Sequence, residues 1–107
     1  MTTGSILVTV ATGGTPIQVT TDATIKVSAI KAQTILGESG KMYLGNSQAM
    51  SKTTYANVLA VLSPVASGPL DRFELVSDEN RNGFQLSSFW VDAETNGQHL
   101  LVTYVIA

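Results

Sequence analysis

The stretch Leu86–Ala107 reads LSSFWVDAETNGQHLLVTYVIA and places two apolar, β-branched and aromatic runs on either side of Asn96-Gly97. An Asn-Gly pair readily supplies the two consecutive positive φ angles that a tight hairpin turn of primed type needs. We therefore expect a β-hairpin here, with its second arm running from His99 to Ala107.

Side chains alternate between two faces along a strand, and both faces of this second arm are largely apolar. One face carries Leu100, Val102, Tyr104 and Ile106, and the other carries Leu101, Thr103 and Val105. A strand that is wetted on one face alternates more strictly between apolar and polar residues. We therefore expect the strand to be covered twice, either by a second layer of the same fold or by another copy of the chain.

The rest of the chain is a series of short β-branched runs, separated by turn signals about every 8 to 12 residues, the spacing of sandwiches and barrels. The runs span residues 5–10, 17–20, 24–30, 41–45, 58–62 and 72–76, with Ile25, Val27 and Ala29 on one side of the third. Gly37–Gly40 predicts the turn of a second hairpin, and Thr53–Ala56 predicts one helical turn. The expected fold is all-β: a single-domain β-sandwich, jelly-roll-like, with about eight short strands and at most one short helical turn.

The length of 107 residues suits one domain with one core, residues 1–107, in which residues 1–23 form an N-terminal strand or an arm. Charged residues make up 13% of the chain. This is about half of the usual fraction of about 25%. A surface built from Thr, Ser, Asn, Gln and Gly is easily dehydrated, which favours packing in an assembly.

The composition also bears on partners and compartment. The net charge is −2 and the six Lys and Arg residues are scattered, so no nucleic-acid footprint is expected. Without cysteine there is no disulfide or thiolate metal site. No run approaches the roughly 20 apolar residues of a membrane span, and no basic leader precedes Ile6–Val10. We expect a soluble chain made in the cytoplasm, without a nucleic-acid or membrane partner.

Residues that catalyse are few. His99 is the only histidine and no glycine-flanked serine motif accompanies it, which favours a surface histidine over the base of a Ser-His-Asp site. Asp92 and Glu94 share one face of an extended segment and are interpreted as a solvated strand end rather than a glycosidase pair. We expect no enzyme activity: no catalytic residues, no cofactor and no metal.

Two glycine-containing segments match ligand-binding loops only in part. Asp78–Gly83 has the first half of a calcium loop, but Phe89 stands where the bidentate Glu belongs. Gly37–Lys41 is too short between its glycines for a phosphate-binding loop, and Met42 replaces the Ser or Thr that would meet magnesium. Both segments are interpreted as turns.

One order of hydrophobic strands and glycines runs along the chain. It is made up of four segments: Ile25–Gln33, Gly40–Gly45, Asn57–Pro64 and Phe89–Tyr104. In this order the chain from Thr24 to Ala107 resembles small virion structural proteins of tailed bacteriophages, of the capsid decoration or cement type. Residues 1–23 lie outside the resemblance.

The resemblance implies a compact β-sandwich or jelly roll that forms a homo-oligomer, commonly a trimer, on the capsid surface of the virion. Such a protein binds the major capsid protein and stabilises the head across the seams between capsomers. We expect Phe89, Trp90, Tyr104 and Ile106 to divide between the core and the subunit interface. The N-terminal residues or the loop Asn46–Thr54 would then touch the capsid.

Two alternatives stay open. Five aromatic residues could form a flat glycan-stacking platform, although core and interface packing is the commoner use of such residues; they are Tyr43, Tyr55, Phe89, Trp90 and Tyr104. The chain would then be a glycan-binding surface module. A tail or neck component of the virion would share the same fold and symmetry.

Overall fold

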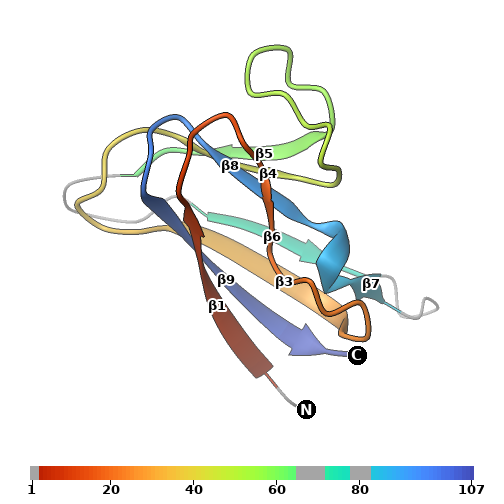
Figure 1. Ribbon diagram of the computed structural model, residues 1–107. Coiled ribbons are helices and arrows are strands. Elements are labelled where there is room, and N and C mark those ends of the chain that lie inside the picture. The colour runs from red at the N-terminus through yellow and green to blue at the C-terminus, as the bar shows by residue number, and fades with distance from the viewer. Residues whose placement is uncertain (1–2, 65–71, 78–82) are drawn as a thin grey trace.

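The computed structural model describes residues 3–64, 72–77 and 83–107. They form nine strands and one 3-10 turn: β1 Thr3–Val10, β2 Ile17–Gln18, β3 Lys26–Thr34, β4 Met42–Gly45, β5 Val58–Leu62, β6 Arg72–Val76, β7 Phe84–Gln85, η1 Leu86–Ser88, β8 Trp90–Ala93 and β9 Gln98–Ile106. The fold is all-β, as the alternation and the turn spacing predict, and it consists of two layers (Figure 1).

The strands form two antiparallel sheets. In sheet A the order is β1-β9-β3-β6, and β7 pairs with β3 beyond the end of β6. In sheet B the order is β2-β8-β4-β5. When β6 and β7 are counted as one interrupted edge strand, this alternation of strands between two sheets is that of an eight-stranded jelly roll.

Residues 3–10 form an edge strand of this sandwich. β1 pairs with β9 without a register shift, from Thr3 opposite Val105 to Val10 opposite Gln98. Both ends of the chain therefore lie at the same end of the sandwich (Figure 1).

One apolar core lies between the sheets. Fifteen buried side chains of the described residues form it: Val8, Val10, Val19, Val27, Ile30, Ala32, Met42, Leu44, Leu62, Leu86, Phe89, Val91, Ala93, Leu100 and Val102. Complete burial of one Val, Leu, Ile, Phe or Met side chain stabilises a fold by about 1.5–3 kcal/mol. These core residues come from both sheets and from the turn between β7 and β8.

The hairpin predicted at Asn96-Gly97 is wrong, because β8 lies in sheet B and β9 in sheet A. In this turn only Gly97 has a positive φ, 77°, and its N–H donates to the carbonyl of Val10 (2.8 Å). The side-chain oxygen of Asn96 accepts from the N–H of Gly13 (2.8 Å). The dipeptide reverses the chain locally, but the faces that must be buried decide which strands pair.

The second predicted hairpin is also wrong, since β3 and β4 lie in different sheets. β3 extends to Thr34, and its register against β9 shifts between Val27 and Ala29. This β-bulge inserts one residue and moves the following side chains to the opposite face. Buried Val27 is therefore followed by buried Ile30 and Ala32, while Ala29 points away from the core.

The helical turn predicted at Thr53–Ala56 is present only as an isolated α-turn, in which the N–H of Tyr55 donates to the carbonyl of Ser51 (2.8 Å). It does not continue as a helix, because Tyr55 and Asn57 have positive φ angles, 62° and 59°. Within the described ranges the one assigned helical element is η1, in a run that the sequence assigns to a hairpin arm. The calcium-like segment, apart from Gly83, lies outside the described residues.

Candidate functional site

The outer face of sheet A is the first candidate site. It consists of the side chains that alternate with the buried ones: Ser5, Leu7 and Thr9 of β1, Leu101, Thr103 and Val105 of β9, Ala29, Lys31 and Gln33 of β3, and Arg72, Glu74 and Val76 of β6. No described strand or helix packs on it, because sheet B covers the opposite face (Figure 1).

This face has apolar rows, and its charged side chains, Lys31, Arg72 and Glu74, lie on β3 and β6. Leu7 lies opposite Leu101, and Ala29 lies between Val105 and Val76. Leu7 is 53% exposed and Val76 is 69% exposed.

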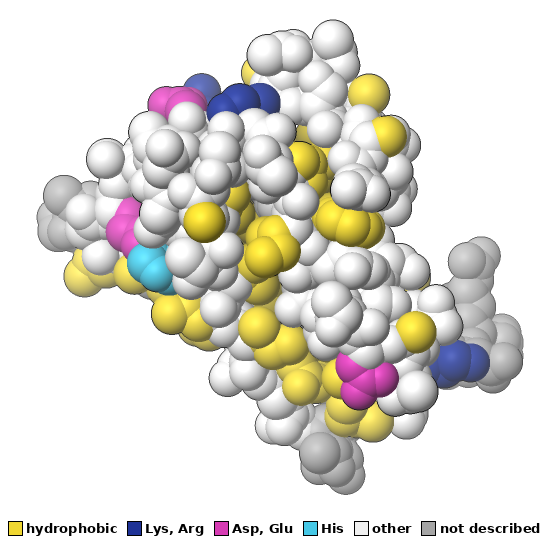
Figure 2. Space-filling model, viewed as in Figure 1, with side chains coloured by type: hydrophobic (Ala, Val, Ile, Leu, Met, Phe, Trp, Pro, Cys, Tyr) yellow, Lys and Arg dark blue, Asp and Glu magenta, His cyan; other side chains and the backbone are white. Residues whose placement is uncertain are grey.

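The ion pair on this face joins Lys31 to Glu74 at 4.0 Å. Both side chains are well exposed, so the pair contributes at most about 1 kcal/mol. On the side of the molecule that Figure 2 shows, charged side chains are few and hydrophobic side chains form a band.

The free edge of β1 adjoins this face. Its eight residues carry no charge and no proline, and its ladder to β9 has no bulge. The other described edges are protected in ways that discourage strand addition: β2 and β7 have two residues each, β6 carries Arg72 and Glu74, and β5 has an irregular register. β1 therefore offers backbone N–H and C=O groups along one unprotected edge.

The two faces of β9, both of which the sequence predicts to be covered, differ in the structure. Leu100 and Val102 are fully buried against sheet B. Leu101, Thr103 and Val105 are half-buried by neighbouring strands of their own sheet, and the described chain supplies no second layer over them.

The four residues expected to divide between the core and the subunit interface differ in their burial. Phe89 is a core residue, 4% exposed, whereas Trp90 points from the other side of β8 and is half-buried. Tyr104 is half-buried on the core side of β9, and Ile106 is 37% exposed near its end. The sequence prediction missed Leu7, although the alternation within residues 5–10 already placed it opposite the valines.

Asp92 and the loops over sheet B form a structural cluster. Asp92 is 2% exposed, so its prediction as part of a solvated strand end is wrong, while Glu94 is exposed. The Oδ1 atom of Asp92 accepts from the N–H groups of Gly14 and Ala93, both at 2.8 Å. The loop after β1 thus folds over the carboxylate and removes it from solvent.

Tyr43 lies opposite Asp92 in sheet B and is 5% exposed. Burial raises the pKa of its phenol, and the charges of Glu94, Tyr55 and Asp92 raise it further. The group is therefore a neutral phenol near pH 7 and does not serve as a base.

His99 is half-buried rather than fully exposed. Its Nδ1 contacts Oε1 of Glu38, and its backbone N–H donates to Oε2 of the same carboxylate (3.0 Å). Glu38 thereby ties the loop after β3 to the start of β9, which gives this histidine a structural role. Over the described ranges, no group of three or more His, Asp or Glu side chains could hold a metal ion.

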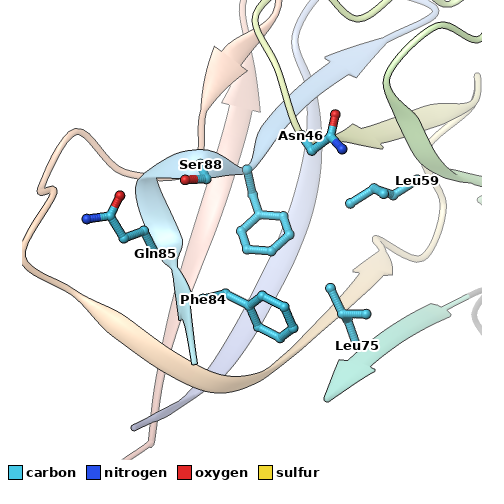
Figure 3. A pocket seen from close by; sticks show the side chains of 7 residues that line it. Asn46, Leu59, Leu75, Phe84, Gln85 and Ser88 are labelled. Atoms are coloured by element: carbon cyan, nitrogen blue, oxygen red, sulfur yellow. The ribbon is translucent and has the colours of Figure 1, made fainter. Parts of the chain in front are cut away.

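An apolar pocket is the second candidate site. It has a volume of about 260 Å³ and lies between β5 of sheet B and β6 and β7 of sheet A (Figure 3). The residues that line it are Asn46, Leu59, Leu75, Phe84, Gln85, Ser88 and Phe89. The rings of Phe84 and Phe89 meet edge to face, with centroids 6.0 Å apart and planes at 77°.

Comparisons with protein-family models, with curated proteins and with solved structures found no match for this chain. In the part of the chain that the structure describes, no helix is long and apolar enough to cross a membrane.

Proposed function

We propose that this chain is a non-enzymatic virion structural protein of a tailed bacteriophage, a capsid decoration or cement protein. It forms a homo-oligomer, a trimer as the sequence resemblance implies, on the surface of the capsid. There it binds the major capsid protein across the seams between capsomers and stabilises the head.

The observation that carries this proposal is the outer face of sheet A with the adjoining free edge of β1. Leu7, Leu101 and Val76 are left without a covering layer in the described chain, and an uncharged edge strand lies beside them. The part of this face formed by β1 and β9 contains no Lys, Arg, Asp or Glu, so burying it removes no such charge from water. Assembly with other copies of the chain and with the capsid shell would bury this face.

Symmetry would multiply modest contacts. A trimer presents three identical sets of contacts to the shell, and once one set is bound the others bind at high effective concentration. Each contact can therefore be weak while the assembled protein is held firmly.

The first test is the absolute mass of the purified protein by light scattering over a dilution series. The proposal expects an oligomer that persists on dilution, near three times the chain mass of 11.3 kDa. Leu7→Lys should shift this mass toward the monomer, because it places a charge on the face that the oligomer would bury. Ile17→Lys is the matched control and should leave the mass unchanged, because Ile17 is an exposed residue of the same size on β2 in sheet B.

A wild-type monomer at every concentration would reject the homo-oligomer. The capsid role is tested separately by co-sedimentation of the protein with shells of the virus that encodes it. An oligomer that fails to sediment with these shells would reject the cement role and favour a tail or neck component.

The glycan-binding alternative has less support. Of its five candidate aromatic residues, only Tyr55 is largely exposed, at 58%, while Tyr43 and Phe89 are buried. Titration of Trp90 fluorescence with monosaccharides and oligosaccharides tests it, because a cement protein should give no saturable change.

A further inference from the structure

The apolar pocket lies between an edge of sheet B and an edge of sheet A. β5 ends sheet B there, and β6 and β7 form the edge of sheet A. Leu59 from β5 and Leu75 from β6 point toward the ring of Phe84 in Figure 3, and the ring of Phe89 lines the pocket beside Phe84. The walls are therefore apolar and come from both sheets.

The size of the pocket limits its occupant. Its volume of about 260 Å³ exceeds the volume of about 150 Å³ that suffices for benzene in an engineered apolar cavity. It is smaller than the range of about 300–1,000 Å³ that is typical of drug-sized ligands. One ring, or two fused rings, would fill it.

The lining also limits the chemistry of the occupant. None of the seven lining residues is charged, which favours a neutral ligand. The polar ones are Asn46, Gln85 and Ser88, and the Gln85 amide already donates to the carbonyl of Ala23 (3.2 Å). The side chain of Asn46 makes no hydrogen bond to described residues and remains available to a ligand, whereas the hydroxyl of Ser88 points away from the rings in Figure 3.

The aromatic walls favour a ring over an aliphatic chain. Phe84 and Phe89 already pack edge to face, and a third ring beside them would extend the same arrangement, worth more than its buried area alone. A sugar does not fit these walls, because most of its hydroxyl groups would lose their hydrogen bonds to water without a replacement.

We infer that this pocket binds one neutral aromatic ring that carries a single hydrogen-bonding group, as in indole or phenol. The ring belongs to a free small molecule, because the volume of about 260 Å³ holds one or two fused rings and little more. This site is separate from the outer face of sheet A and does not depend on the proposed function.

The experiment follows the methyl signals of Leu59 and Leu75 by NMR of the intact protein. The probes are indole, phenol, toluene, N-acetyltryptophanamide and glucose. Indole and phenol should give saturable shifts, toluene should bind more weakly, and glucose should give none. N-acetyltryptophanamide should bind more weakly than indole, because its peptide part exceeds the pocket. Tighter binding of N-acetyltryptophanamide than of indole would overturn the small-molecule assignment in favour of an aromatic side chain of a partner.

Two variants on one strand separate pocket binding from surface binding. Leu59→Trp fills the pocket, and Val61→Trp adds the same ring on β5 at a residue of equal exposure that does not line it: Leu59 is 38% exposed and Val61 is 39% exposed. Indole affinity should fall at least about tenfold in Leu59→Trp and stay within about twofold in Val61→Trp. Asn46→Ala should weaken indole by about three- to tenfold, the effect of one hydrogen bond, and leave toluene unchanged.

The inference is overturned if no ring compound gives saturable shifts at Leu59 and Leu75. It is also overturned if Leu59→Trp, folded by its amide spectrum, binds indole as well as wild type does, or if glucose binds while the rings do not.

Discussion

The phenol ring of Tyr104 lies across the backbone of Gly4, its partner in the β1–β9 ladder, so that a Cβ atom at position 4 would be 2.6 Å from Cζ and Oη of the ring. We expect Gly4→Ala to lower the free energy of unfolding by about 1 kcal/mol, because the far end of a tyrosine can swing aside at modest cost. Chemical denaturation measures the loss. Ser5→Ala, at the exposed next residue, is the control, and an equal loss in both variants would contradict the close approach.

Local sequence patterns predict the strands of this protein better than their partners. The apolar patterns of residues 72–76 and 99–107 predict β6 and β9, because the two faces of each strand can be assigned from its own sequence alone. Asn96-Gly97 fails as a hairpin signal because its geometry reverses the chain whether the next strand pairs with the last or crosses to the other sheet. The bulge after Val27 has no local signal, because the extra residue is defined only against β9.

The candidate sites show the same division. The sequence predicts the apolar second face of β9 from Leu101 and Val105, and this face indicates a covering layer or partner. The pocket was not readable, since Leu59 and Phe84 are distant in the sequence and only the packing of two sheets places them together. Asp92 was misplaced for a similar reason: the loop that buries it is joined to the far end of the chain.

Gly83 and Gly37 separate steric crowding from backbone strain. Their φ angles are alike, 87° and 85°, but a Cβ at Gly83 would be 2.5 Å from the carbonyl oxygen of Val27, whereas a Cβ at Gly37 would meet nothing within 4 Å. Gly37→Ala should cost only the strain of a left-handed alanine, about 1 kcal/mol. Gly83→Ala should cost about 3 kcal/mol, because backbone atoms of β3 must also move. Denaturant midpoints compare the two, and equal losses would show that the crowding is relieved.

Asp92 and Glu94 should differ sharply in their effect on stability. Asp92→Ala removes the acceptor of two N–H groups, those of Gly14 and Ala93, and leaves the Ala93 group in a buried site. We expect a loss of about 2–4 kcal/mol in the free energy of unfolding. Glu94→Ala, at an exposed residue two positions along the chain, should change it by less than about 0.5 kcal/mol. Thermal and denaturant unfolding of both variants check this, and an Asp92→Ala protein as stable as wild type would show that the loop after β1 does not depend on the carboxylate.

Tyr43 should make the protein sensitive to alkali. Burial, with the charges of Glu94, Tyr55 and Asp92, raises the pKa of its phenol above the ordinary value of 10.0. The folded protein therefore keeps this proton at pH values where the unfolded chain has released it, so the contribution to stability is complete below about pH 10 and is lost as the pH rises through the folded pKa. Tyr43→Phe cannot ionise, and its stability should fall less than that of wild type between about pH 8 and pH 11. Tyr104→Phe, at a tyrosine of the other sheet, is the control for general tyrosine ionisation. Urea denaturation at both pH values measures the difference, and parallel losses in wild type and Tyr43→Phe would rule out the buried phenol as the source.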